Sequence, residues 1–293
     1  IYNFFLFSTF MPIYSHSKLS TFEQCKLKYK FRYIDKIIPE VEETIETHLG
    51  SAVHSTLEWL YKLVILSKIP SIDETIMHYH QEWENNWVDD IVIVNKKMSK
   101  ENYFERGIRF ILDYYTEHAP FDDNTIEIEK KIFVKIGDEE HTLQGFIDRL
   151  VHNLKTEEYE IHDYKTSGTL PSKERIENDR QLALYSIAIK EIFGNDKKVK
   201  LIWHYLHFNK KIEIYKTDEQ IERLKEKIQL LINEIESTNE FPPMVSALCD
   251  WCEYKNICPA WNSDDNTNKI IKSKEERGKR ISDFPTLKKY LND

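Results

Sequence analysis

The segments Gly145-Phe-Ile-Asp148 and Glu160-Ile-His-Asp-Tyr-Lys165 decide the fold of this chain. The first segment lies toward the end of one predicted strand, at about 140–152, and the second lies in the next predicted strand, at about 157–166. A polar turn joins them, so the two strands are expected to pair as a hairpin. Alternate residues of a strand share a face, and Asp163 and Lys165 therefore point one way while Tyr164 points the other. Asp148, Asp163 and Lys165 then meet at one end of a sheet.

Two carboxylates and an ammonium at one place indicate metal-dependent hydrolysis. Mg²⁺ and Mn²⁺ prefer oxygen ligands, which Asp148, Asp163 and the Tyr164 carbonyl can supply. Lys165 can orient a water molecule and support its deprotonation, while the metal neutralises charge that builds on a phosphate. The alternative is that Asp163 and Lys165 form an ordinary surface ion pair at a strand end.

The other elements follow from hydrophobic periodicity. They predict an α/β chain with a central mixed sheet flanked by helices. Residues 50–120 read as a helical insertion and residues 125–216 as the core of the sheet. The predicted strands outside the hairpin lie at 125–134, 200–208 and 211–215, and the predicted helices near 15–33, 50–64, 72–87, 101–118, 172–193, 218–236 and 285–291.

Two of these helices carry further candidate residues. Gly50 opens a helix on which His54 lies near the start, where a side chain can reach into a cleft, although a lone histidine there is more often structural. The long helix at 172–193 places Gln181 and Tyr185 on one face, because residues four apart are neighbours on a helix.

The four cysteines form the most specific local pattern. Cys249, Cys252 and Cys258 are spaced C-x2-C-x5-C, and Cys25 lies far upstream, in a helix that Ser20 and Glu23 are expected to cap. A disulfide framework does not fit an intracellular chain of this size. Four thiolates suit either Zn or a four-iron, four-sulfur cluster, and ordinary buried thiols are the alternative.

Composition sets outer limits on function. The chain has 293 residues, 41% of them hydrophobic, so it can bury a large core. A formal net charge of -9 argues against a generally basic nucleic-acid binder, but leaves room for a local basic channel. The basic and aromatic run from Lys26 to Tyr33 can either touch phosphates or form a solvated helix face over a buried aromatic stripe.

The two ends of the chain are interpreted separately. Residues 1–10 are apolar but fall short of the roughly 20 residues that span a bilayer, and they lack the features of a signal peptide. We expect either a natural start at Met11, with 1–14 an extension, or an ordered N-terminal arm. Residues 262–293 form a polar tail after a single domain at 15–261. A soluble, cytoplasmic protein without a membrane partner is expected.

Six motifs occur in a characteristic order. They are the cysteine-bearing first helix, Gly50-x-x-x-His54, Gly145-Phe-Ile-Asp148, Asp163-Tyr-Lys165, Arg180-Gln-Leu-x-Leu-Tyr185 and the terminal cysteine cluster. From about Ser15 to Trp261 the chain resembles the RecB-like branch of the PD-(D/E)XK nuclease superfamily. It is most similar to the iron-sulfur members, the AddB nuclease domain and the nucleases of CRISPR adaptation. The resemblance implies a restriction-endonuclease-like core with a helical insertion and a C-terminal cysteine-rich cluster segment.

The resemblance also implies residue roles. His54, Asp148, Asp163 and the Tyr164 carbonyl correspond to metal ligands, and Lys165 to the catalytic lysine. Gln181 and Tyr185 correspond to a motif that helps to hold the site and the DNA strand. The implied ligands of a 4Fe-4S cluster are Cys25, Cys249, Cys252 and Cys258. Glu129 stands where relatives often carry an acid and is a secondary candidate. Lys26 departs from the proline that commonly follows the first cysteine.

The implied activity is Mg²⁺- or Mn²⁺-dependent hydrolysis of DNA, as an exonuclease on single-stranded ends in repair or recombination. The alternatives are DNA processing for CRISPR adaptation and a weakly catalytic DNA-binding module. The chain has no Walker motif, so a helicase or a CRISPR integrase that works with it would be a separate protein.

Overall fold

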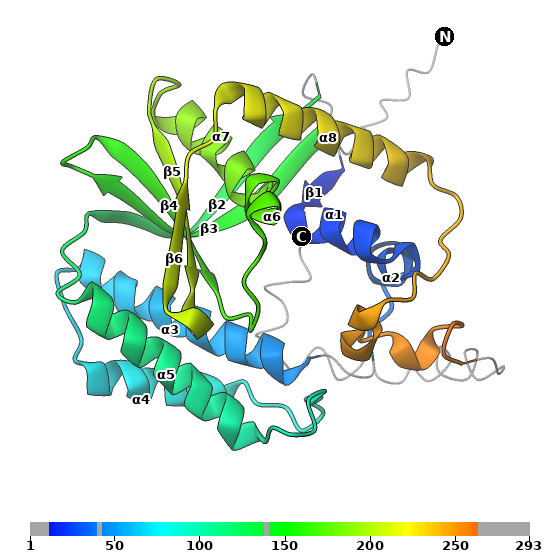
Figure 1. The fold of residues 1–293 in the computed structure, drawn as a ribbon, viewed down its shortest axis with the longest axis horizontal. Coiled ribbons are helices and arrows are strands. Elements are labelled where there is room, and N and C mark those ends of the chain that lie inside the picture. Colours follow the sequence, from blue (N-terminus) through cyan, green and yellow to red (C-terminus); the bar gives the residue numbers. More distant parts are fainter. Residues whose placement is uncertain (1–11, 40–42, 138–140, 263–293) are drawn as a thin grey trace, which may run out of the picture.

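The computed structural model describes residues 12–39, 43–137 and 141–262, which form a six-stranded sheet with helices on both faces. Figure 1 shows α7 and α8 on one side of the sheet and α3 to α5 on the other. The strands are β1 (Ile13–Ser15), β2 (Thr125–Ile136), β3 (His141–Asn153), β4 (Glu158–Lys165), β5 (Val199–Tyr205) and β6 (Lys210–Ile214). The expected α/β class is confirmed.

The sheet is mixed, and β3 is its shared central strand. β2 pairs with β3 antiparallel, β4 pairs with β3 antiparallel, and β5 lies parallel to β4 and antiparallel to β6. The other edge of β3 changes partner along its length. Its C-terminal half pairs with β4 as far as Arg149 and His162, and its N-terminal end pairs with β1, from Thr142 to Gln144. Between these pairings β3 and β4 diverge, which opens a fork in the sheet.

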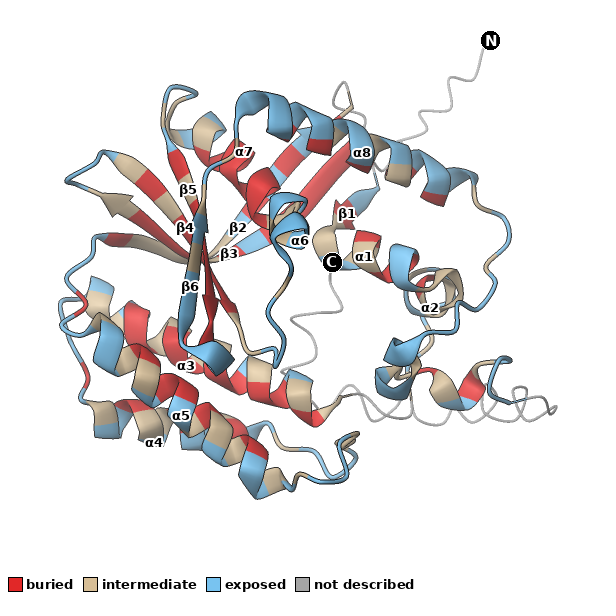
Figure 2. Ribbon diagram, in the orientation of Figure 1, coloured by how far each residue is buried: buried red, intermediate tan, exposed pale blue. Residues whose placement is uncertain are grey.

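Two apolar cores hold the layers together. The first lies between the sheet and the helices α1 (His16–Gln24), α7 (Gln181–Phe193) and α8 (Asp218–Ser237). The second lies among α3 (Ile45–Ile65), α4 (Ile72–Asn85) and α5 (Lys100–His118), and reaches the sheet at Tyr164. Figure 2 shows the buried residues along the strands and on the helix faces turned toward them. None of the helices that the structure describes is both long and apolar enough to span a membrane.

The starts of two helices differ from the sequence prediction. Gly50 lies inside α3, which begins at Ile45 because Thr44 accepts a hydrogen bond from the N–H of Thr47. Helix α1 begins at His16, where Ser15 accepts from the N–H of Lys18, so Ser20 is an interior residue and no cap. These serine and threonine caps satisfy N–H groups that a helix start leaves unpaired.

The predicted helix at 172–193 is two helices, α6 (Lys173–Glu177) and α7. The break arises because the Asp179 carboxylate accepts a hydrogen bond from the N–H of Gln181, at 2.9 Å, which starts a new helix. Similarly, the predicted strand at 200–208 ends at Tyr205 and continues as a short 3-10 turn, Leu206–Phe208. The first break matters for function, since it puts Gln181 in the first turn of α7.

Cys25 lies between two helices, and the prediction that it sits within one is wrong. Its backbone is extended, and it separates α1 from α2 (Lys26–Tyr29), which continues as a π-helical turn over Lys30–Ile34. Tyr29 is buried while Lys30 and Phe31 are half-buried, which favours the interpretation of a helix face over an aromatic core. The predicted natural start at Met11 and the predicted helix at 285–291 lie outside the described residues.

Candidate active site

The fork between β3 and β4 places Asp148 beside the backbone of Tyr164. Because the two strands no longer pair there, the N–H of Tyr164 donates to the Asp148 carboxylate, with a nitrogen to Oδ2 distance of 2.9 Å. The predicted hairpin is therefore correct, and it is its open end that brings the carboxylate to the second strand. Asp148 is half-buried, so it can face a ligand from a sheltered position.

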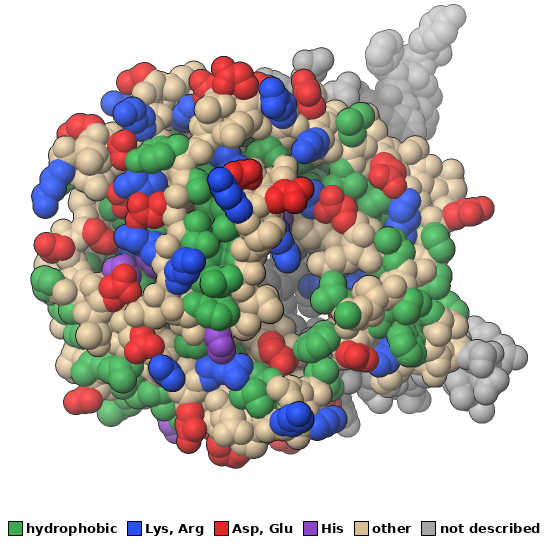
Figure 3. All heavy atoms as spheres, viewed as in Figure 1, with side chains coloured by type: hydrophobic (Ala, Val, Ile, Leu, Met, Phe, Trp, Pro, Cys, Tyr) green, Lys and Arg blue, Asp and Glu red, His purple; other side chains and the backbone are tan. Residues whose placement is uncertain are grey.

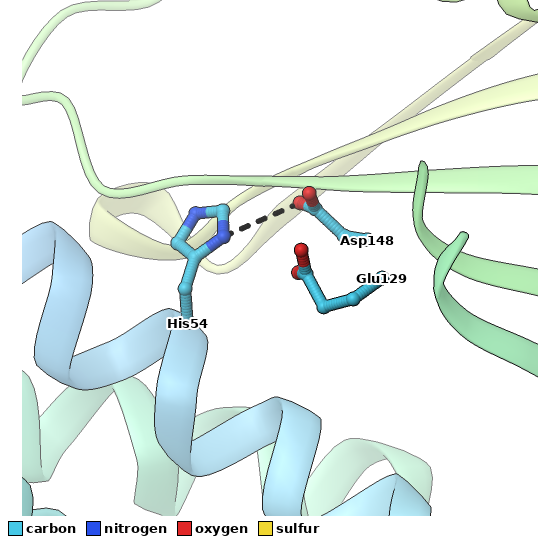
Figure 4. Close-up of side chains that lie close together, drawn as sticks. All are labelled: His54, Glu129 and Asp148. Carbon is cyan, nitrogen blue, oxygen red and sulfur yellow. Dashed lines mark ion pairs between the residues drawn. The ribbon is translucent and has the colours of Figure 1, made fainter. Parts of the chain in front are cut away.

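Three side chains from three elements converge at this point. His54 of α3, Glu129 of β2 and Asp148 of β3 each bring a potential metal-ligating atom within 4.8 Å of the others. Figure 4 shows the imidazole and both carboxylates turned toward one another. The Nδ1 atom of His54 lies 3.4 Å from Oδ2 of Asp148. One imidazole and two carboxylates suit a divalent cation such as Mn²⁺ or Mg²⁺.

The protonation state of His54 strengthens this assignment. Its Nε2 atom lies 2.8 Å from the carbonyl oxygen of Tyr164. A carbonyl only accepts hydrogen bonds, so Nε2 carries the proton. In the neutral imidazole, Nδ1 then presents a lone pair to the Asp148 carboxylate. Two acceptors that face each other are favourable only with a proton or a cation between them.

Glu129 reaches the group through an unusual backbone conformation. It lies between the pairs Ile128–Arg149 and Lys130–Ile147, opposite Asp148, and its φ angle is 46°. This left-handed region is uncommon for residues other than glycine and costs about 1 kcal/mol or more. Such strain is typical of functional sites. The sequence pattern supports only a secondary role for Glu129, whereas the structure places it inside the group.

The second acidic residue, Asp163, lies in a neighbouring polar cluster. Nζ of Lys165 is 2.6 Å from its Oδ2, and Nε2 of Gln181 donates to its Oδ1 at 3.2 Å. Lys165 also donates to Oε1 of Gln181 at 3.3 Å. The predicted set is therefore brought together as two adjacent groups, His54 with Asp148 and Asp163 with Lys165 and Gln181.

The electrostatics of the two groups are linked. Burial raises the pKa of Asp148 to about 6, the charge of Asp163 acts in the same direction, and His54 opposes both. For Lys165, burial disfavours the charged form, but the carboxylates of Asp163, Asp148 and Asp179 outweigh it and raise its pKa. Lys165 is thus a protonated ammonium at neutral pH. In this charged form it can hold a phosphate or a water molecule.

Helix α7 contributes Gln181 and Tyr185 from one face. Tyr185 packs its ring directly on the backbone of Gly145 in β3, where a Cβ atom would lie only 2.2 Å from ring atom Cε1. Burial raises the pKa of Tyr185 to about 12. Gly145 is therefore required by the close approach of a ring, and this contact fixes α7 against the strand that carries Asp148.

A buried polar network supports the site from the side of the sheet that packs against α3 and α5. Arg149 is fully buried, and its guanidinium donates to the Tyr164 hydroxyl at 3.0 Å and to the carboxylate of Asp123. It also lies 2.8 Å from Nδ1 of His162. Arg149 follows Asp148 in the chain, and Tyr164 lies between Asp163 and Lys165. The network therefore links β3 and β4, the strands that carry Asp148 and Asp163.

The sequence from residue 13 to residue 259 matches the family model of the PD-(D/E)XK nuclease superfamily. The chain belongs to this superfamily. It is accordingly a phosphodiester hydrolase of the nuclease class, and members of the superfamily use a divalent metal. The sequence motifs predict that the family's pair of acidic residues and its lysine correspond in this PD-(D/E)XK nuclease to Asp148, Asp163 and Lys165, which lie at the fork.

Two solved structures that match this chain have low sequence identity to it. One, named "Putative exonuclease" and from Eubacterium rectale, is 12% identical, with a TM-score of 0.47, over 82% of this chain and 86% of that chain. The crystal structure of SSO0001 is 17% identical, with a TM-score of 0.33, over 74% of this chain and 96% of that one. No curated protein matches the sequence.

The sequence analysis missed two supporting residues. Arg149 is a charged residue in the apolar stretch from Leu143 to Val151, and that contrast was the available signal. Asp179 starts α7 through its carboxylate and also raises the pKa of Lys165. It lies within what the periodicity predicts as one continuous helix, so no pattern marks it.

The cysteines line a single pocket at the far end of the molecule. Cys25, Cys249, Cys252 and Cys258 are all unpaired and half-buried, and all four border this pocket. The N–H groups of Met244 and Ser246 lie 3.4 Å from the sulfur atoms of Cys25 and Cys249, respectively. Backbone N–H groups aimed at sulfur are typical of thiolates that bind a metal or a cluster.

Proposed function

We propose that this PD-(D/E)XK nuclease is a metal-dependent deoxyribonuclease that degrades DNA from single-stranded ends, in repair or recombination. The observation that carries the proposal is the convergence of His54, Glu129 and Asp148 next to the pair Asp163 and Lys165. An imidazole, three carboxylates and one ammonium provide both ligands for a cation and a positive charge for a phosphate.

Each residue has a role that follows from its position. His54, Glu129 and Asp148 would hold Mg²⁺ or Mn²⁺, with Asp163 and the Tyr164 carbonyl next to them. A metal bound there supplies Lewis acidity and lowers the pKa of a bound water molecule. Tyr164 currently accepts a hydrogen bond from His54 and gives its N–H to Asp148, so its backbone sets the orientation of both side chains.

Lys165 acts through its charge. Its raised pKa keeps it protonated, so it stabilises negative charge on the phosphate oxygens and positions the attacking water. Gln181 holds both Lys165 and Asp163 by hydrogen bonds, and it is therefore a positioning residue. Tyr185 keeps Gln181 in place by anchoring the first turns of α7 to Gly145.

We also propose that the four cysteines bind a 4Fe-4S cluster with a structural role. In the described part of the chain, the group of His54, Glu129 and Asp148 is the one set of three or more potential ligand atoms that all lie within 4.8 Å of one another, so no three cysteine sulfur atoms are that close. A zinc ion with Zn–S bonds of about 2.3 Å would draw four thiolates to within roughly 4 Å of one another. The wider arrangement of the cysteines around one pocket favours the larger cluster.

The experiment is a digestion of end-labelled DNA with Mg²⁺ or Mn²⁺. We expect linear single strands to be degraded and circular single strands to resist, because an exonuclease needs an end. Lys165→Ala and Asp163→Ala should each lower the rate by at least about 100-fold. The control is Lys173→Ala, since this lysine side chain is 90% exposed.

Undiminished activity in both variants would refute the assignment of the site. Rapid cutting of circular DNA would refute the requirement for ends, but the assignment as a nuclease would stand. A folded wild-type protein that binds DNA but never cleaves it would favour the binding-module hypothesis.

A further inference from the structure

The strand pair β2–β3 continues beyond the group of His54, Glu129 and Asp148 and presents two aromatic rings. In its register Lys131 lies opposite Phe146, and Phe133 lies opposite Gln144. Ile132 and Val134 are buried in the core under α7 and α8, so their neighbours Lys131 and Phe133 point to the opposite face. Ile147 is buried on the core side in the same way, and Phe146 therefore shares the outer face with Asp148.

The two rings are large apolar groups left partly in water. Phe133 is 49% exposed and Phe146 is 41% exposed. The ammonium of Lys131 lies over both, 5.5 Å from the centre of Phe133 and 5.7 Å from that of Phe146. A single exposed phenylalanine needs no explanation, but two adjacent rings with a cation between them form a small, defined surface. We call Lys131, Phe133 and Phe146 the ribbon track.

The ribbon track has the chemistry of a site for unpaired nucleotides. Bases of single strands stack on aromatic side chains exposed on a β-sheet, with little dependence on sequence. Lysine next to the rings neutralises phosphates, which a chain with a net charge of -9 must do locally. Lys135 extends the same face by one more cation, and it also donates to Thr142 at 3.1 Å.

The position of the ribbon track connects it to the candidate active site. Phe146 and Asp148 are two residues apart on one strand face, which separates them by about 7 Å along the strand. A base stacked on Phe146 would thus belong to a nucleotide next to the one at the candidate active site. Duplex DNA keeps its bases inside, so only an unpaired strand can use these rings.

We propose that the ribbon track binds the unpaired strand of a nucleic-acid substrate, with bases on Phe133 and Phe146 and a phosphate on Lys131. This proposal rests on the nuclease function proposed above, and it names the residues that hold the unpaired strand next to the site.

The binding test separates this proposal from catalysis. Affinity for fluorescent oligothymidylate and for a blunt duplex is measured by anisotropy in EDTA, so that no hydrolysis occurs. The variant Phe133→Leu with Phe146→Leu keeps apolar bulk but removes both rings. We expect it to bind the single strand at least about tenfold more weakly, with less than a twofold change for the duplex. Replacement of both residues by Trp should restore binding.

The matched control is Phe208→Leu, which alters a ring of similar exposure, 39%, on another part of the surface. In digestion assays the double Leu variant should raise KM for single strands about tenfold and change kcat less than threefold. Unchanged binding by this variant overturns the proposal, as does an equal loss for both DNA forms. A change in oligomeric state with unchanged DNA binding also overturns it, because the rings would then be an interface between copies.

If the wild type lacks metal-dependent cleavage, the proposed function fails. The binding assay still tests whether the ribbon track binds an unpaired strand.

Discussion

Tyr164 joins the candidate site to the second core. Its backbone contacts His54 and Asp148 in the candidate site, while its hydroxyl accepts from Arg149 and lies 3.1 Å from the hydroxyl of Tyr114 in the second core. A residue fixed at both ends has little freedom to rotate. The geometry of the two flanking residues, Asp163 and Lys165, therefore depends on a network that no substrate touches.

Removal of Asp123 tests that network. Asp123→Ala leaves the buried guanidinium of Arg149 without its carboxylate partner. Loss of one partner of a fully buried pair costs about 3–5 kcal/mol, and we expect about 2 kcal/mol because the Asp123 side chain is 34% exposed. Urea unfolding measures the free energy. Asp122→Ala, at the exposed neighbouring position, should change it by less than about 0.5 kcal/mol.

The histidines around Arg149 make stability depend on pH. Burial and the charge of Arg149 lower the pKa of His118 to about 4, below the usual 6.5. Above pH 6.5 both the folded and the unfolded chain hold this imidazole neutral. Below it only the unfolded chain binds the proton, so stability falls as the pH drops from 6.5 toward 4. The loss should reach about 2 kcal/mol after an allowance for solvent screening.

The measurement compares urea unfolding at pH 7 and at pH 5. His118→Phe keeps a ring against Tyr114, which lies 4.1 Å away between ring centres, and should reduce the loss on acidification. His80→Gln, at an exposed position, should leave it unchanged. An identical pH dependence in wild type and His118→Phe would contradict this account.

At the scale of elements, the packing of α7 on β3 decides where Gln181 lies. Gly145→Ala would insert a methyl group into the ring of Tyr185, and overpacking of this kind costs about 1–3 kcal/mol. Because α7 must then shift, the nuclease rate should fall more than the stability alone explains. Thermal unfolding and digestion of single-stranded DNA check both effects.

The matched control for this change is Gly168→Ala, since an added Cβ there meets nothing within 4 Å. The pair Gly145→Ala with Tyr185→Ala removes the clash and should regain part of the stability. If Gly145→Ala were as stable and as active as wild type, the ring contact would have no role in placing α7.

The sequence predicts most of the elements but not the breaks between them. The period of two between Thr125 and Lys165 predicts three strands close to their observed bounds, and from them that Asp148, Asp163 and Lys165 lie near one another. The break before Gln181 is not predicted from the sequence. A single residue, Asp179, accepts from the first N–H of the new helix and leaves the hydrophobic period intact. The position of Glu129 in the group is not predicted either, since its φ angle depends on the sheet rather than on the local sequence.

At the scale of the whole molecule, charge is distributed rather than concentrated. On the face shown in Figure 3, acidic and basic side chains are interspersed, with no large region of one sign. Association with DNA from this face would gain little from long-range attraction. We therefore attribute substrate binding to short-range contacts at the fork and on the ribbon track.

The cysteine pocket joins two parts of the chain that are distant in sequence. Besides Cys25, the N-terminal part contacts this segment through Lys28, 2.8 Å from Glu253, and through the Ile37 carbonyl, which accepts from Tyr254 at 2.9 Å. Such exposed or half-buried contacts are weak individually. Most of the strength of this junction should come from the group bound by the thiolates.

Cys25→Ser tests the junction in anaerobically purified protein. We expect loss of visible absorption and faster proteolytic cleavage within residues 238–262, since one cluster ligand is missing. Ser17→Ala, at an exposed position on the preceding helix α1, should change neither. Colourless wild-type protein with stoichiometric zinc would refute iron, and equal proteolysis of the Cys25→Ser variant would refute a structural role for the bound group.

The parallel pairing of β1 with β3 has a consequence for the order of folding. Ile13 pairs with Thr142, so the first strand cannot be placed until the ribosome has delivered a partner that lies far along the chain. The antiparallel meander β2–β3–β4 is local and can form before it. We expect hydrogen exchange during refolding to protect the meander early and β1 late, so that β1, which precedes the meander in the chain, is assembled after it.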